Sequence, residues 1–427
     1  MEPPAASAAS LLADHARCTS ASWRVGDLHV GLRTKVGLRG YPGVDGALLA
    51  LGEALRRGRA APPERSGGAV RALDLTGAPG ALAAWAAAAG VDADWVVALS
   101  SAAAVAAARE GLAATVAATR DGLAAAPPAG VRATAVAALP WEVAGPFDWI
   151  VWRPPADRGV RRVRAELAAV AAALAPGGEA LLLQHKDEGA QRSEREAAER
   201  FERVETVARE AGWRLSVLRG PRPAAAVDPW VSFEPPTGGA VRAIVGTFAA
   251  EKVDPGTAVL LRALAESRAP GSDASGVAPR LLDLGCGTGL LARAALVAGA
   301  RAVVAVDDDL AAVRSTTAQV GGDPRAAVVH ADLLRPTDAA HAPLLADGGF
   351  DEVWCNPPFH VGRQVVSALS RAFVAAAHQA LRPGGVAWFV VNRALPYERE
   401  FAAWGAHADV TPVGERSFTV WRAVRGR

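Results

Sequence analysis

The sequence repeats its own landmarks at an interval of about half its length, and this repeat constrains the fold more than any other feature. Four landmarks match in the same order: Asp45 with Asp254, Asp74 with Asp283, Phe147–Pro155 with Phe350–Pro358, and Ala175–Gly178 with Arg382–Gly385. The first two pairs are each 209 positions apart. Such a series predicts two copies of one domain.

Each copy has the pattern of an α/β domain. From residue 69 onward, short apolar runs typical of buried strands alternate with helical patterns, which predicts a mostly parallel sheet with crossover helices. We place the first domain at residues 23–236 and the second at 240–427, joined by the turn-rich segment 234–239. Residues 1–22 are expected to form a loose terminus. Within the first domain we expect a short hairpin over 23–39, followed by a helix over 46–57.

Composition excludes several classes of protein. The 427 residues are 51% apolar, which suits large cores and argues against disorder. Three cysteines without a CxxC pair predict neither a disulfide framework nor a structural zinc site, and indicate a reducing, cytoplasmic setting. The N-terminus carries no basic and apolar leader pattern, and no uninterrupted apolar run reaches 18 residues, so we expect neither secretion nor a membrane span. A net charge of +2 says little about partners.

A glycine-rich turn marks the second copy as a nucleotide-type site. Arg280–Leu284 predicts a buried strand, and a helix is expected from Leu290. Between them Gly285, Gly287 and Gly289 follow a G-x-G-x-G spacing, which departs from the G-x-G-x-x-G of dinucleotide sites. With Asp283 before it, the turn resembles the pattern of class I S-adenosylmethionine-dependent methyltransferases. A turn used only for tight helix–strand packing is the alternative.

Three acidic positions and one neighbour complete the expected cofactor site. Asp283 precedes the turn, where a carboxylate can hold the α-ammonium group of the methionine part. Asp307 ends the next strand and can accept hydrogen bonds from both ribose hydroxyls, although capping of the next helix would also explain an acid there. Asp332 ends a third strand and could take the adenine amino group, while Leu333 could offer its backbone N–H. An exposed loop aspartate is the alternative for Asp332.

The first copy differs where the chemistry would be. It has Thr76 for Gly285, Ala78 for Gly287, Ser100 for Asp307, and Arg153 for Asn356. Side chains in the turn would crowd a ligand, and the ribose-binding acid is missing. We therefore interpret the first copy as a retained fold that has lost its cofactor site.

The segment Asn356-Pro357-Pro358-Phe359 follows a strand in the second copy, at the sheet edge where α/β proteins bind ligands. An exocyclic amine is a poor nucleophile, and two acceptors can orient its lone pair toward the methyl group. Asn356 Oδ1 and the Pro357 carbonyl are the expected acceptors, and Phe359 can stack on a flat substrate. His360 lies beside them and could touch substrate, without a catalytic role. An ordinary Asn-Pro turn is the alternative.

Finer details resemble one family. Besides residues 355–360, Val391–Tyr397 and Phe248 with Val253–Thr257 are similar to the RsmC/RlmG family of ribosomal RNA guanine-N2 methyltransferases. The resemblance implies two tandem Rossmann-like class I methyltransferase domains, each a mostly parallel seven-stranded sheet with flanking helices. It adds Asp254 and Gly256 to the cofactor-binding residues. It makes Pro358 and His360 substrate contacts, together with Asn392 and Arg393, which could instead cap the strand before them.

The same resemblance implies a function. The second domain would transfer the methyl group of S-adenosylmethionine to guanine N2 in ribosomal RNA, with 16S small-subunit rRNA expected, acting as a monomer without a metal. The first domain would recognise RNA or stabilise the second. Two rivals remain open: methylation of adenine N6 or of a protein glutamine, which the same acceptors would serve, and a non-catalytic RNA-binding assembly factor.

Overall fold

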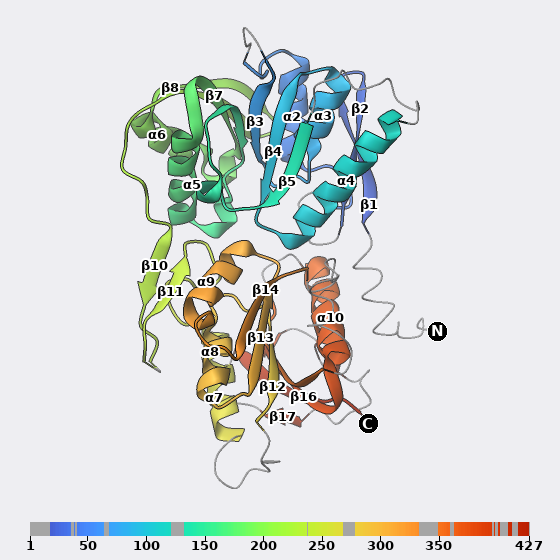
Figure 1. The fold of residues 1–427 in the computed structure, drawn as a ribbon, viewed down its shortest axis with the longest axis vertical. Coiled ribbons are helices and arrows are strands. Elements are labelled where there is room, and N and C mark those ends of the chain that lie inside the picture. Colours follow the sequence, from blue (N-terminus) through green and yellow to red (C-terminus); the bar gives the residue numbers. More distant parts are fainter. Residues whose placement is uncertain are drawn as a thin grey trace. The chain divides into compact units, whose positions relative to one another are not determined.

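A computed structural model describes residues 18–35, 38, 41–63, 68–120, 132–236, 238–267, 278–332, 349–358, 363–394, 397, 400–401, 409–411 and 417–426. The chain forms two compact units, an N-terminal unit over Cys18–Pro229 and a C-terminal unit over Trp230–Arg427. Each unit contains one large sheet with helices on both faces, as Figure 1 shows.

The N-terminal unit is built on a seven-stranded sheet in the order β5-β4-β3-β6-β7-β9-β8. The strands are β3 (Val70–Leu75), β4 (Ala93–Leu99), β5 (Arg132–Ala137), β6 (Phe147–Trp152), β7 (Leu174–His185), β8 (Phe201–Glu210) and β9 (Trp213–Pro221). The pairs from β5 to β7 are parallel, and β9 runs antiparallel to both β7 and β8. A separate hairpin of β1 (Thr19–Val25) and β2 (Leu28–Thr34) precedes the sheet.

The C-terminal unit repeats this topology, with the order β14-β13-β12-β15-β16-β18-β17. Its strands are β12 (Arg280–Leu284), β13 (Ala302–Asp307), β14 (Ala326–His330), β15 (Phe350–Cys355), β16 (Leu381–Asn392), β17 (Asp409–Thr411) and β18 (Phe418–Val424). Counted along each unit, both sheets follow the order 3-2-1-4-5-7-6, with strand 7 antiparallel to its neighbours. The predicted duplication and the two seven-stranded α/β folds are therefore confirmed.

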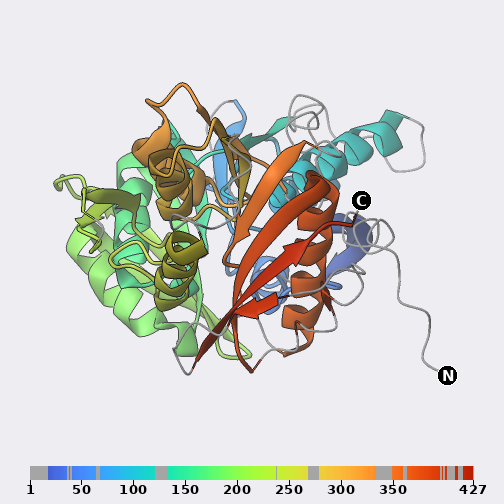
Figure 2. The same cartoon turned by 90° about the horizontal axis from the view of Figure 1, so that it is seen from below.

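Helices cover both faces of each sheet. In the N-terminal unit, α2 (Gly46–Arg56), α3 (Ala81–Ala89) and α4 (Ala102–Arg120) pack on one face, and α5 (Val160–Ala173) and α6 (Ala190–Arg200) on the other. In the C-terminal unit, α7 (Pro255–Ser267), α8 (Leu290–Val297) and α9 (Leu310–Val320) lie opposite α10 (Arg363–Ala380). Figure 2 shows α10 on its own side of the strands.

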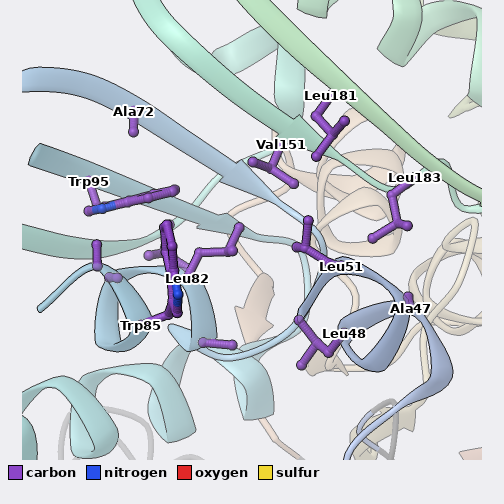
Figure 3. Packing of buried hydrophobic residues seen from close by; sticks show 14 of the residues in the cluster. Ala47, Leu48, Leu51, Ala72, Leu82, Trp85, Trp95, Val151, Leu181 and Leu183 are labelled. Atoms are coloured by element: carbon purple, nitrogen blue, oxygen red, sulfur yellow. The ribbon is translucent and has the colours of Figure 1, made fainter. Parts of the chain in front are cut away.

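Alternation of side chains along the strands explains these layers. In β6, Trp149 and Val151 face α2 and α3, whereas Ile150 and Trp152 face α5. Both faces are apolar because helices cover both, as in other parallel sheets. Figure 3 shows the first of these cores, in which Leu51 of α2 lies against the strands of the sheet.

Two boundaries differ from the sequence-based expectations. The hairpin begins at Thr19, inside the range expected to be a loose terminus, because β1 pairs with β2 along its whole length. The segment Glu234–Gly239 was expected to join the two domains. In the structure it connects β10 (Trp230–Phe233) to β11 (Val241–Ile244), which pair as an antiparallel hairpin within the C-terminal unit. None of the helices in the described part of the chain is long and apolar enough to cross a membrane.

The β1–β2 hairpin is expected to be integral to the N-terminal unit. Trp23 is fully buried, and a Cβ added at Gly52 of α2 would lie 2.9 Å from Trp23 Nε1, so the indole and the helix are in close contact. Trp23→Ala should lower the free energy of unfolding of this unit by about 3–5 kcal/mol in urea titrations. Leu49→Ala, at a half-exposed position of the same helix, should cost less than about 1 kcal/mol. If Trp23→Ala and Leu49→Ala lower the free energy of unfolding equally, this packing is contradicted.

Candidate active site

The expected site residues follow four adjacent strands, β14, β13, β12 and β15, at their carboxyl ends. Asp283 pairs in register with Ala305 of β13 and with Trp354 of β15. The glycine turn after β12 and Asn356 after β15 therefore leave the sheet side by side. This is also where the strand order reverses direction, the position at which open α/β sheets bind ligands.

The turn folds back onto β13 through its backbone. The amides of Gly285 and Cys286 both donate to the Val306 carbonyl, at 2.9 and 3.0 Å. The three turn glycines have φ values of 84°, 53° and 80°, in the left-handed region that other residues rarely adopt. The sequence pattern thus corresponds to a backbone that needs glycine.

Two of these glycines differ in what surrounds them. A Cβ added at Gly289 would lie 2.9 Å from Thr316 Cα, so this glycine is required by packing of the turn against α9. A Cβ added at Gly287 would meet nothing within 4 Å. Gly287 therefore borders open space at the edge of the sheet, where a ligand could approach the backbone.

Asp283 is completely buried beneath the turn. Its Oδ2 accepts a hydrogen bond from the Ala292 amide at 2.9 Å, while Oδ1 has no hydrogen-bond partner among the described residues. Burial raises the pKa of Asp283 to about 7, against the opposing effect of the Ala292 hydrogen bond. The unpaired oxygen is a buried acceptor, a kind of group that native structures usually satisfy.

Asp307 connects the end of β13 to the turn. Its Oδ2 accepts from the Gly287 amide at 3.0 Å, and its Oδ1 accepts from the Asp309 amide at 2.9 Å. The helix cap of α9 is Asp309, whose side chain accepts from the Ala311 amide, so Asp307 is not needed for capping. Burial raises the pKa of Asp307 to about 7, although part of the side chain remains accessible.

Asp332 is buried two residues beyond the end of β14, not exposed in a loop. The neighbouring His330 is hydrogen-bonded to the Asp308 carbonyl at 2.9 Å, which ties this strand end to the one carrying Asp307. Leu333, the expected backbone donor, lies outside the described residues.

Asn356 is held by the N-terminus of α7. Its Nδ2 donates to Asp254 Oδ2 and to Thr257 Oγ1, both at 2.9 Å. Asp254 Oδ2 also accepts from the Thr257 amide at 2.9 Å, in the manner of a helix N-cap. Asn356 Oδ1 is buried and has no hydrogen-bond partner in the part of the chain that the structure describes.

The remaining expected substrate residues fall into two groups. Pro357 is buried and Pro358 is exposed beside Asn356, while Phe359 and His360 lie outside the described residues. Asn392 Oδ1 accepts from the Ala394 amide at 3.0 Å, closing a turn at the end of β16. This contact gives Asn392 a local structural role, and Arg393 beside it is exposed.

Gly256 lies in the first turn of α7, and a Cβ there would meet Asp254 Oδ2 at 3.0 Å and Phe418 Cε1 at 3.2 Å. The local reason for this glycine is therefore packing around Asp254. The sequence predicted no role for Thr257 or Thr316. In the structure, Thr316 Oγ1 donates to the Gly287 carbonyl at 3.1 Å. The signal for Thr257 is its position three residues after a capping aspartate.

The cysteines offer no alternative chemistry. None of the three forms a disulfide among the described residues, and burial raises the pKa of the Cys286 and Cys355 thiols, which favours their protonated form. Among the described residues, no cluster of three or more histidine, cysteine, aspartate or glutamate side chains could hold a metal ion.

The corresponding turn of the N-terminal unit contains side chains that bond within the turn. Thr76 donates to Asp74 Oδ1 through both its amide, at 2.9 Å, and its hydroxyl, at 2.7 Å. The Ala78 amide in turn donates to Thr76 Oγ1 at 3.2 Å. The threonine hydroxyl thus engages the buried carboxylate from within the turn.

Arg153 replaces the asparagine in this unit and changes the contact. Its guanidinium forms an ion pair with Asp45 Oδ2 and lies 4.8 Å from the centre of the Trp213 ring. The side chains of Arg153 and Asp45 are only 9% and 13% exposed. Asp45 still caps α2 through Oδ1, at 2.7 Å from the Ala47 amide. This ion pair therefore stands where the C-terminal unit has the hydrogen bonds from Asn356 Nδ2 to Asp254 and Thr257.

Comparisons with known proteins show that the chain is similar to methyltransferases. Residues 239–418 match the family model of the methyltransferase small domain. Ribosomal RNA small subunit methyltransferase C of Alcanivorax borkumensis is 32% identical over 180 residues, which cover 42% of this chain and 50% of that protein. Ribosomal RNA large subunit methyltransferase G of Streptomyces griseus subsp. griseus is 37% identical over 182 residues, covering 42% of this chain and 44% of that protein. The chain thus matches about half the length of these curated relatives.

A solved structure resembles the chain over almost its full length. The "T. Thermophilus 16S rRNA N2 G1207 methyltransferase (RsmC) in complex with AdoMet and Guanosine" is 29% identical and matches with a TM-score of 0.74, covering 97% of this chain and 100% of that one. The strand order, the glycine turn and the family match define the C-terminal unit as a class I methyltransferase domain. With its duplicated fold, the chain is similar to the RsmC/RlmG rRNA methyltransferases, over its C-terminal half to the curated relatives and over almost its full length to this structure.

The buried carboxylate predicts a specific dependence of stability on pH. Because the pKa of Asp283 is raised on folding, its favourable contribution is present at low pH and is lost as the pH rises through about 7. Relative to Asp283→Asn, the wild type without ligand should lose about 2–3 kcal/mol in the free energy of unfolding of the C-terminal unit between pH 5 and pH 8.

The matched control is Asp74→Asn in the N-terminal unit, where burial raises the pKa of Asp74 only to about 6 against the opposing Thr76 hydrogen bonds. Between pH 5 and pH 8, the free energy of unfolding of the wild type should fall by about 1 kcal/mol relative to Asp74→Asn. Urea titrations at the two pH values measure both. If the difference in free energy of unfolding between the wild type and Asp283→Asn is the same at both pH values, the raised pKa of Asp283 is contradicted.

Proposed function

We propose that the C-terminal unit binds S-adenosylmethionine and transfers its methyl group to the exocyclic N2 of a guanine in ribosomal RNA. The observation that carries this proposal is the Asn356 side chain. Its amide nitrogen is fully engaged by the protein, while its buried Oδ1 is without a partner among the described residues. An unsatisfied buried acceptor at the carboxyl end of β15 suits an incoming N–H donor.

The residues around the glycine turn fit the cofactor. Asp283 would hold the α-ammonium group, for which its unpaired buried Oδ1 is an available acceptor. Asp307, which is partly accessible, would bind the ribose hydroxyls, and Asp332 would contact the adenine. Gly287 leaves open space for the ligand beside the backbone.

The catalytic contribution of the chain is positioning. S-adenosylmethionine, when bound, supplies an activated methyl group that needs neither a metal nor a covalent enzyme intermediate. Asn356 Oδ1 would accept one hydrogen of the guanine amine and the Pro357 carbonyl the other, which turns the nitrogen lone pair toward the methyl group. Phe359 would stack on the base and Pro358 would border it. The base must be unpaired or flipped out for its amine to enter this site.

The finer parts of the proposal follow from the family. The relatives include enzymes named for the small and for the large ribosomal subunit, and the full-length structural match, named as a 16S rRNA methyltransferase, favours the small subunit. The N-terminal unit, which has Thr76 and Ala78 in its turn, would have lost cofactor binding and would recognise RNA or stabilise its partner unit. We expect a monomer acting where ribosomal RNA is made, in the cytoplasm. His360, Asn392 and Arg393 remain proposed contacts to RNA.

The direct test is mass spectrometry of the modified nucleosides in ribosomal RNA. A strain lacking the protein should lose N2-methylguanosine from one rRNA, and the wild-type gene should restore it. Asn356→Ala should lower the rate of methyl transfer by about 10²-fold or more, because the amine is no longer oriented, while S-adenosylmethionine still binds. Loss of N6-methyladenosine, or an unchanged set of rRNA nucleosides, would contradict the proposed acceptor.

Cofactor binding should involve one site per chain, in the C-terminal unit. Gly287→Asn should weaken S-adenosylmethionine binding by about 10²-fold, because asparagine tolerates the left-handed backbone but its side chain enters the open space. Gly77→Asn is the matched control, since Gly77 has a φ of 75° and equally open surroundings in the N-terminal turn. Calorimetry that finds two sites, or an effect of the Gly77 change, would contradict this assignment.

A further inference from the structure

The side-chain amide of Asn356 is oriented by two residues outside the Asn-Pro-Pro-Phe motif, Asp254 just before α7 and Thr257 in its first turn. Both Nδ2 hydrogens are engaged, one by Asp254 Oδ2 and one by Thr257 Oγ1, at 2.9 Å each. Since an amide nitrogen carries two donors and no acceptor, this pair satisfies it completely. The orientation of the amide is therefore set by α7, and not by the loop that carries Asn356.

The opposite orientation of the amide is unfavourable for electrostatic reasons. It would place Asn356 Oδ1 against Asp254 Oδ2, so that two acceptors would face each other at hydrogen-bond distance. It would also remove both Nδ2 hydrogen bonds. Asp254 consequently forces Oδ1 to the other side, where it is buried and has no partner among the described residues. A buried unsatisfied acceptor costs about 1–3 kcal/mol, which a substrate donor would recover on binding.

We propose that Asp254 and Thr257 are positioning residues that fix Asn356 Oδ1 as the acceptor for the substrate amine. This inference rests on the proposed function and adds to it two residues that do not themselves touch the reacting atoms. The N-terminal unit provides an internal comparison. There Asp45 occupies the equivalent cap, but its second oxygen pairs with Arg153, so the cap is kept while the amide is absent.

The positioning role can be separated from helix capping. Aspartate, asparagine and serine are similarly good N-cap residues, so capping alone predicts that Asp254→Asn and Asp254→Ser behave alike. The positioning role predicts a difference. The Oδ1 of an asparagine can replace Oδ2 and accept from both the Thr257 amide and Asn356 Nδ2. A serine hydroxyl, on a shorter side chain, can still cap the helix but does not extend to the Asn356 amide.

The first measurement is methyl transfer to rRNA, with S-adenosylmethionine affinity and thermal midpoint as controls. Asp254→Ser and Thr257→Val should each lower kcat by about 10-fold to 100-fold, because the acceptor loses its orientation. Asp254→Asn and Thr257→Ser, which keep the oxygen in place, should stay within about 3-fold of wild type. All four variants should keep the thermal midpoint, and kcat is measured at saturating S-adenosylmethionine because Asp254 is also an expected cofactor-binding residue. Equal kcat values for Asp254→Ser and Asp254→Asn would overturn the inference.

The second measurement does not depend on activity. Solvent exchange of the Asn356 side-chain amide hydrogens can be followed by nuclear magnetic resonance, with the signal assigned by its loss in Asn356→Ala. Exchange should be slow in the wild type and in Asp254→Asn, and at least about 10-fold faster in Asp254→Ser. Fast exchange in the wild type would overturn the inference. If the wild type transfers no methyl group to rRNA, the proposed function fails. The exchange rate still decides whether Asp254 and Thr257 hold the Asn356 amide.

Discussion

The parallel pairing of β12 with β15 is the constraint on which the rest of the site depends. It brings together two chain segments that are more than sixty residues apart, a glycine turn and an asparagine, at one edge of the sheet. The turn borders a space for a ligand, and the asparagine presents an acceptor beside it. Neither segment defines a reaction alone, and their relative position comes from strand register. Helix α7 then adds the orientation that the sheet cannot supply.

The glycines of the two turns differ in whether packing requires them. Gly289 and Gly80 both precede a helix in the left-handed conformation; a Cβ at Gly289 would lie 2.9 Å from Thr316 Cα, whereas one at Gly80 would make van der Waals contact with Leu112. This position is glycine in both units. Gly287 borders open space, and the corresponding position of the N-terminal unit is an alanine, Ala78. The glycine that borders open space is therefore the one that differs between the units, as the proposed loss of cofactor binding in the N-terminal unit requires.

Much of the fold followed from the sequence, because its signals are local. The strand before the glycine turn, the helix after it and the strand before Asn356 were predicted from apolar runs and glycine spacing, and each is confirmed. The boundary between the units was harder, because β10 is recognisable only through its pairing with β11. For the site, residue identities could be proposed but not their contacts. The role of Thr257 depends on a hydrogen bond across 99 positions, which no local pattern encodes.

The buried ion pair of Arg153 and Asp45 has an evolutionary consequence. Removing the arginine leaves the partly enclosed Asp45 carboxylate without its counter-charge, and breaking such a pair typically costs about 3–5 kcal/mol. Most single substitutions at Arg153 would therefore be selected against for stability, whatever they did for catalysis. If the N-terminal unit has lost cofactor binding as proposed, this ion pair would oppose the return of a second working site. The proposed division of roles between the two units would then be maintained by folding stability as well as by selection for function.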